Sequence, residues 1–245
     1  MRSIRAGKLI GILLGMLAVT AQAGEGVLDS IQTLRSESFR VCADILLGYD
    51  PYAREFDRGK AGEYQAGLAR LDELSGAAKV VSLRTEQAAF LATVRELEAQ
   101  PTDVSAVAIN NVLEAQARLL DAADQLYAQQ SHSGQEAKQQ LHALSMASAR
   151  MLILYQIRPY GGLIKYPGLP IDEGGLTGLD AQIRSGMDAL RQSEGELEQQ
   201  IAALEQNYAF VRPRIFDAQK QLVAHGINYY LGRNIGQLDS LARRM

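Results

Sequence analysis

Apolar residues recur every three or four positions along most of this chain, which is the spacing of one face of an α-helix. Two such stripes run from Leu83 to Leu97 and from Ala108 to Leu126. The longest stripe contains Leu176, Leu179, Ile183, Met187, Leu190, Leu197, Ile201 and Leu204. Stripes of this kind form the seams between packed helices, so the pattern predicts an all-α protein.

Helix ends are expected where Pro, Gly and short polar residues interrupt the stripes. Such breaks occur at Pro101 and at 131–134, and two longer connections rich in Gly, Pro and Tyr span 49–62 and 159–175. Short turns favour antiparallel neighbours. The pattern therefore predicts about six helices, at 26–48, 63–100, 103–130, 135–158, 176–210 and 214–243.

The two halves of the chain resemble each other. "FRVCADILLGYDPYAREF" and "ARMLILYQIRPYGGLIKY" each place an arginine, Arg40 or Arg150, in an apolar helix that soon ends in Pro-Tyr. The offset between the two segments is about 110 residues. We therefore expect two diverged three-helix repeats, at 24–131 and 132–245, packed together as one elongated antiparallel bundle that forms one four-helix-bundle-like module or two stacked ones.

The N-terminus has the pattern of a secretory signal peptide. Basic residues precede the apolar run Leu9 to Val19, and Ala21-Gln22-Ala23 is an A-x-A cleavage signal. The run is shorter than the roughly 20 residues that a membrane-spanning helix needs. We expect residues 1–23 to be removed and the mature protein to be periplasmic or secreted. The alternative is an uncleaved N-terminal anchor.

Composition narrows the possible functions. The net charge of −3 gives no basic face overall, which argues against nucleic acid as a partner. The three histidines lack metal-ligand spacing, and no Ser, His and acid set suggests catalysis, so we expect a non-enzymatic protein without metal or cofactor. The single cysteine, Cys42, lies among apolar residues and is expected to be a buried thiol, with an intermolecular bridge as the alternative.

Arg150 is the first candidate ligand-binding residue. It shares a helical row with Met146, Ile153 and Ile157, and an unpaired guanidinium removed from water costs several kcal/mol. Its planar fork suits a carboxylate or an oxyanion such as nitrate or phosphate. The alternatives are a side chain that reaches the surface along its stem, or a structural ion pair with Asp44, Asp121, Asp124 or Asp188.

The segment around Arg150 resembles a known family. Arg150-Met151-Leu152, together with helices of the type "FLATVRELEAQP", is similar to the PilJ-type sensory domain, the extracytoplasmic module of type IV pilus chemotaxis transducers, which is related to the nitrate sensor domains of NarX-like kinases. The family pattern is Gly-x-x-Arg-Met-Leu-Ser-Gln-Arg. Here Ala147 replaces the Gly and Ile153, Leu154 and Tyr155 replace Ser-Gln-Arg, while the first repeat keeps only Arg40.

The resemblance implies that Arg150 and Arg40 bind a small anion between them. It also implies a membrane transducer or kinase as partner, because the signalling modules of the family are not in this sequence. A slide of packed helices on ligand binding would carry the signal, and a homodimer is left open.

A second candidate surface is the aromatic connection after Arg150. Tyr155, Tyr160 and Tyr166 could form a partner surface, since tyrosine is enriched at interfaces. Alternatively, these rings pack back on the core. The sequence therefore favours an exported sensory module that binds a small anion or a protein. A structural adaptor or chaperone-like scaffold in an envelope assembly is the alternative.

Overall fold

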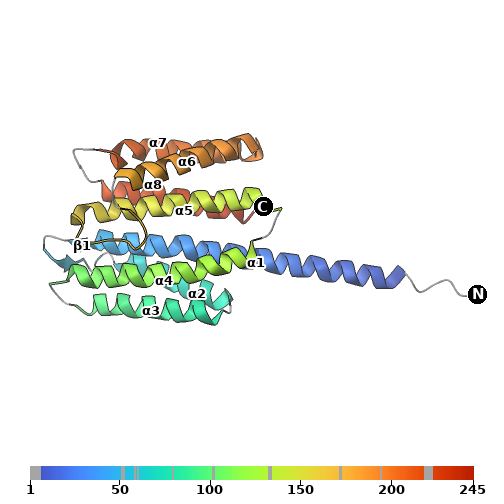
Figure 1. The fold of residues 1–245 in the computed structure, drawn as a ribbon, viewed down its shortest axis with the longest axis horizontal. Coiled ribbons are helices and arrows are strands. Elements are labelled where there is room, and N and C mark those ends of the chain that lie inside the picture. Colours follow the sequence, from blue (N-terminus) through green and yellow to red (C-terminus); the bar gives the residue numbers. More distant parts are fainter. Residues whose placement is uncertain are drawn as a thin grey trace, which may run out of the picture.

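The structure is a computed structural model that describes residues 7–50, 53–57, 59, 61–78, 80–100, 103–131, 134–170, 173–193, 195–217 and 223–245. Within these ranges the chain forms eight α-helices and one minimal β-hairpin, so the predicted all-α class is confirmed (Figure 1). The helices are α1 (Gly7–Gly48), α2 (Ala61–Ala78), α3 (Val81–Glu98), α4 (Ala106–Gln130), α5 (Glu136–Ile157), α6 (Glu173–Ser193), α7 (Glu198–Ile215) and α8 (Ala224–Ala242).

The short elements lie between the helices. The strands β1 (Tyr49–Asp50) and β2 (Glu55–Phe56) pair antiparallel after α1, and the 3-10 turns η2 (Arg158–Tyr160) and η3 (Gly195–Leu197) follow α5 and α6. The predicted break at Pro101 lies outside the described residues, as do 132–133 of the predicted turn after α4.

The prediction of six helices is corrected to eight among the described residues. The expected helix 63–100 is α2 and α3, and Val80 has the extended backbone of a helix N-cap. The expected helix 176–210 is likewise α6 and α7, separated by η3. In both places the apolar spacing continues across a break of only a few residues, so periodicity alone does not reveal it. The last helix begins at Ala224 rather than near 214, because α7 continues through Pro213 to Ile215.

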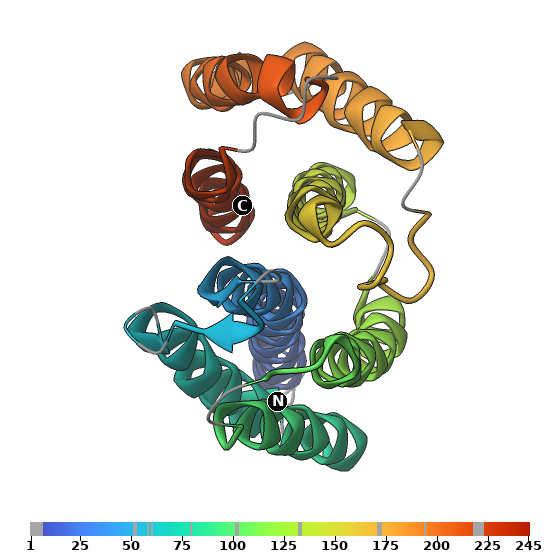
Figure 2. The ribbon, with the colours of Figure 1, turned by 90° about the vertical axis from the view of Figure 1, so that its left-hand side faces the viewer.

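Each half of the chain closes into a ring of four helices. In the first unit α1 packs against α2 and α4, and α3 against α2 and α4. In the second unit α5 packs against α6 and α8, and α7 against α6 and α8. The units join through α1, which also contacts α5 and α8 (Figure 2). The expected three-helix repeats are therefore four-helix units.

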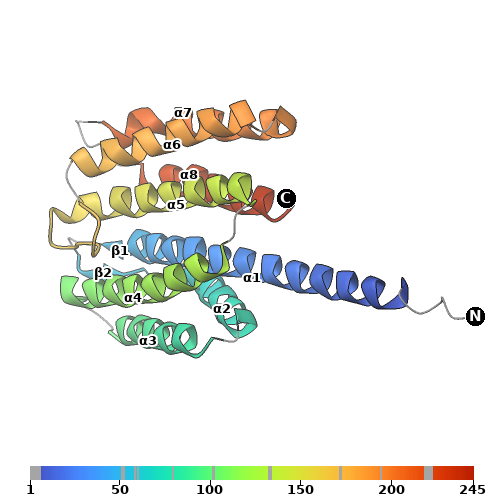
Figure 3. The ribbon, with the colours of Figure 1, turned by 45° about the vertical axis from the view of Figure 1, so that its right-hand side comes forward.

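The first half of α1 projects beyond the bundle (Figure 3). The predicted signal peptide falls in this part, where residues 7–23 have helical backbone and residues 1–6 are outside the described ranges. In the described part of the chain, no helix combines the length and apolar character needed to cross a membrane.

The core is centred on α1 and α5. From Leu144 to Ile157 every side chain of α5 is buried except Arg150, which is partly exposed. Cys42 of α1 is fully buried and forms no disulfide, so the expectation of a buried thiol is confirmed. Burial raises the pKa of this thiol well above its usual range, which keeps it protonated and unreactive.

The connection after α5 folds back on the first unit. Gly161 ends η2 with a left-handed backbone (φ 58°), which favours glycine. Farther along, Asn110 of α4 donates to the Leu163 carbonyl at 3.0 Å and accepts from the Lys165 amide at 3.0 Å. These paired bonds fix the connection 161–170, called the covering loop below, against α4.

Candidate functional site

Arg150 lines a cavity of about 440 Å³ between α4, α5, α6 and the covering loop. The covering loop runs past α4 and α5 on one side of the molecule (Figure 2). The lining residues come from both four-helix units and comprise Phe39, Leu120, Asp121, Asp124, Arg150, Leu154, Tyr166, Pro167, Gly168, Leu169, Pro170, Gly174, Gly175, Gly178, Leu179 and Gln182. A volume of this size is in the range of small-molecule sites.

The wall of the cavity is closed by a tight contact between α6 and the covering loop. A Cβ atom at Gly175 would lie 2.3 Å from the Pro170 carbonyl oxygen, so a side chain at this position would force the backbone apart. Gly168 has φ 75°, a conformation that L side chains rarely adopt. Glycine at these two positions therefore shapes the cavity.

The guanidinium of Arg150 has no hydrogen bond or ion pair with any residue that the structure describes. Three of the four acids suggested by the sequence have other partners. Asp124 binds Arg35 at 2.6 Å, Asp44 accepts from Asn228 at 2.8 Å, and Asp188 pairs with Arg191 at 3.6 Å. The fourth, Asp121, lines the same cavity as Arg150.

Tyr166 is a buried residue of the cavity lining. Its hydroxyl donates to Gln116 Oε1 at 2.5 Å, and its ring packs on Phe39 with 5.3 Å between centroids. Burial raises the pKa of this phenol far above its usual range, so the hydroxyl remains a donor. Arg150 acts on the same pKa in the lowering direction and Asp121 in the raising direction, so both charges lie within electrostatic reach of Tyr166.

Arg40 does not line this cavity, which corrects the expectation that it shares an anion with Arg150. Its guanidinium binds Glu37 at 2.9 Å and faces α8, where its Nε would lie 3.8 Å from a Cβ atom at Gly232. The equivalent positions of α1 and α5 thus face the last helix of the opposite unit, Arg40 towards α8 and Arg150 towards α4. The two arginines therefore lie in different surroundings.

The expectation of a partner surface at Tyr155, Tyr160 and Tyr166 is also corrected. These side chains are only 1%, 4% and 5% exposed. Tyr155 accepts from the Val223 amide at 3.1 Å, and Tyr160 donates to the Leu46 carbonyl at 2.8 Å. The rings pack on the core, as the alternative interpretation held.

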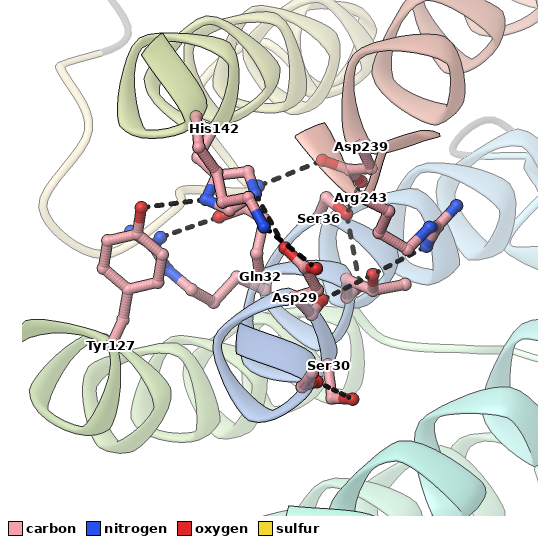
Figure 4. Close-up of polar contacts among 12 residues, drawn as sticks. Asp29, Ser30, Gln32, Ser36, Tyr127, His142, Asp239 and Arg243 are labelled. Carbon is pink, nitrogen blue, oxygen red and sulfur yellow. Dashed lines mark hydrogen bonds and ion pairs between the residues drawn. The ribbon is translucent and has the colours of Figure 1, made fainter. Parts of the chain in front are cut away.

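A buried polar cluster that the sequence analysis did not identify lies where α1, α4, α5 and α8 meet (Figure 4). Lys138 binds Asp29 at 3.3 Å, and His142 Nδ1 lies 2.9 Å from the Tyr127 hydroxyl. Burial, together with the positive charges of Lys138, Arg35 and Arg243, lowers the pKa of His142 to about 3. The imidazole is therefore neutral near pH 7, and its Nδ1 can accept a hydrogen bond from the Tyr127 hydroxyl.

The other part of the cluster surrounds Asp239 of α8. Gln32 donates to the Oδ1 atom of Asp239 at 3.2 Å. The Ser36 hydroxyl lies 2.5 Å from the Oδ2 atom of Asp239 and 3.1 Å from the Thr33 carbonyl. Burial raises the pKa of Asp239.

Comparison of the chain with models of known protein families, with curated proteins and with solved structures finds no match. In the described ranges, no three His, Cys, Asp or Glu side chains group as metal ligands would. The lining of the Arg150 cavity offers charged groups, hydrogen-bonding groups and apolar side chains to a ligand.

Proposed function

We propose that this chain is a non-enzymatic sensory module that binds a small anionic ligand at Arg150 and relays its presence to a membrane signalling partner such as a transducer or kinase. The observation that carries the proposal is the position of Arg150. A guanidinium on the wall of a small-molecule-sized cavity, without a hydrogen bond or ion pair to the described residues, offers a forked donor to a carboxylate or an oxyanion.

The resemblance to the PilJ-type sensory domain supports the same function. The Arg-Met-Leu triplet that carries the resemblance begins at Arg150, the residue on the cavity wall. Membership of that family, and with it a role in type IV pilus chemotaxis, remains part of the proposal. The proposed site differs from the nitrate sites of that family in one respect: Arg40 faces α8 and would not contribute to the Arg150 cavity.

The cavity also suggests how binding would be relayed. Its lining includes Asp121 and Leu120 from the first unit and Arg150 and Leu179 from the second. A ligand that touches both units favours the arrangement of the two units in which all of these contacts are made. It can shift the equilibrium between this arrangement and another only by the difference in its affinity for the two. A small slide of α4 against α5 is the proposed movement.

The same module would work outside the cytoplasm. The basic N-terminal residues, the apolar run Leu9 to Val19 and the Ala21-Gln22-Ala23 signal support export with cleavage near Ala23. In an exporting host, the mass of the processed protein is expected to match a chain that begins at Gly24. A full-length mass in the exported fraction would contradict cleavage.

Anion binding is tested by thermal melting in nitrate, nitrite, phosphate and small carboxylates at constant ionic strength, with chloride as the reference. A ligand present at one hundred times its dissociation constant adds about 2.7 kcal/mol of stability. For a chain of this size that corresponds to roughly 5–10 °C in Tm. Arg150→Gln should abolish the shift. If no small anion raises Tm in the wild type, the proposed anion site is refuted.

A structural adaptor is the second candidate, and one observation favours it. Phe210 of α7 and Tyr229 of α8 are 66% and 61% exposed, and both rings contact Tyr230, with centroid distances of 4.8 and 5.2 Å. Exposed aromatic groups of this kind are common at protein interfaces. A scaffold would bind its partner through these rings without any ligand at Arg150, so an unchanged Tm in every anion favours the scaffold.

A further inference from the structure

The Arg150 cavity is lined by one cation, Arg150, and by two acids, Asp121 and Asp124. Asp121 projects from α4 and Arg150 from α5, and both line the cavity. Like Arg150, Asp121 makes no hydrogen bond or ion pair within the described ranges of the chain. A simple anion such as nitrate would satisfy Arg150 alone and would leave the carboxylate of Asp121 close to a second negative charge.

The second acid of the cavity, Asp124, already has a partner. Asp124, one turn farther along α4, is bound to the Arg35 Nε at 2.6 Å, and the Arg35 guanidinium also stacks on Tyr127 at 4.2 Å from the ring centroid. Asp124 also lines the cavity, but its Oδ1 is already paired with Arg35. Asp121 is therefore the acid of this cavity that has no hydrogen bond or ion pair within the described ranges.

Apolar side chains from both units also line the cavity. Phe39 and Leu120 come from the first unit, Leu154 and Leu179 from the second, and Leu169 from the covering loop. Such a surface favours an apolar group of a ligand, because contact removes hydrocarbon from water on both sides. The cavity thus presents an unpaired cation, an unpaired acid and apolar side chains together.

We propose that the ligand of this cavity is a small zwitterion, an amino acid with an apolar side chain. Its carboxylate binds the forked N–H donors of Arg150, its ammonium binds Asp121, and its side chain lies against the leucines and Phe39. The inference rests on the proposed function, since it uses the same arginine, and it narrows the ligand class from anions in general to amino acids. A ligand held by α4 and α5 at once also bridges the two four-helix units.

The two charged contacts should contribute unequally. Arg150 is partly buried and offers two parallel hydrogen bonds to a carboxylate, whereas Asp121 is exposed and its attraction is screened by water. Loss of the Arg150 contact is therefore expected to weaken binding by about 100-fold or more, and loss of the Asp121 contact by about 5- to 10-fold.

Titration calorimetry with matched probes tests this assignment. The probes are leucine, 4-methylpentanoate (leucine without the ammonium), 3-methylbutylamine (leucine without the carboxylate) and nitrate, with phenylalanine as a larger zwitterion. We expect leucine or phenylalanine to bind the wild type about 5- to 10-fold more tightly than 4-methylpentanoate, and 3-methylbutylamine not to bind. Asp121→Asn should remove this preference without weakening the binding of 4-methylpentanoate.

The matched control is Asp188→Asn, which neutralises an exposed acid of α6 that does not line the cavity and should leave every affinity unchanged. If 4-methylpentanoate or nitrate binds as tightly as the amino acids, or if Asp121→Asn leaves the preference intact, the zwitterion assignment is overturned while the anion site stands. If neither amino acids nor anions bind, both proposals are overturned.

Discussion

Phe39→Ala is expected to lower the free energy of unfolding by about 3–5 kcal/mol, the usual cost of removing a buried phenylalanine ring. Phe39 is fully buried in α1, and its ring packs against Tyr166 of the covering loop. Removal of the ring takes away apolar contact on the α1 side and extends the adjoining cavity, since Phe39 is part of its lining. Urea denaturation of the two proteins measures the difference.

Phe210→Ala is the matched control for this experiment. It deletes the same ring from α7, where the side chain is 66% exposed, and exposed substitutions usually change stability by about 0.5 kcal/mol or less. Equal losses in the two variants would contradict the assignment of Phe39 to the core between α1 and the covering loop.

Acidification is expected to destabilise the fold through His142. The folded-state pKa of this group is about 3, below its ordinary 6.5, so between these values the unfolded chain binds more protons than the folded one. Stability therefore rises with pH across this window and is lost as the pH falls from about 6.5 towards 3, by up to about 1.4 kcal/mol per pH unit. Chemical denaturation at pH 4, 5, 6 and 7.5 measures the slope.

His142→Gln is the control for this effect, because a glutamine side chain can accept from Tyr127 but does not titrate. The variant should lose less stability than the wild type between pH 7.5 and pH 4. Asp239 acts in the opposite sense: its pKa is raised, so its contribution falls as the pH rises through the folded-state pKa. Equal pH dependence in the wild type and His142→Gln would show that His142 is not held neutral by burial.

The helical periodicity predicted the fold class and the main helices, because each helix buries one stripe against a neighbour. It did not separate α2 from α3 or α6 from α7. At Val80 and at η3 the chain turns within a few residues, and the apolar stripe resumes on the far side without a long polar gap. The geometry of such short turns depends on packing between the helices, which cannot be read from a single sequence.

The candidate site could be predicted in part. Arg150 was identifiable as a lone charge among apolar residues of one helix, and the structure places it on a cavity. Asp121, which lines the same cavity, was only one of four acids that could be suggested, since it lies on α4 and Arg150 on α5, on either side of a turn. Arg40 occupies the equivalent place in α1, but the repeats turn these positions to opposite sides, so sequence equivalence did not imply a shared site.

The buried polar cluster was beyond sequence reasoning for a different reason. Gln32 and Asp239 are bonded across 207 positions of the chain, and Lys138 and Asp29 across 109. A usable signal was nevertheless present, since Asp29, Gln32 and Ser36 follow the three- and four-residue spacing of a single helical face. Polar residues on a face that should be apolar indicate partners elsewhere in the core, but not which ones.

The central claim is that Arg150, and not Arg40, holds the ligand. The most direct measurement is titration calorimetry of the tightest-binding small carboxylate or amino acid against the wild type, Arg150→Gln and Arg40→Gln. Each variant removes one positive charge from the first or second unit, so the change in overall charge is the same. The structure predicts an affinity lower by about 100-fold or more in Arg150→Gln and unchanged in Arg40→Gln. Equal loss in both variants, or loss in Arg40→Gln alone, would contradict it.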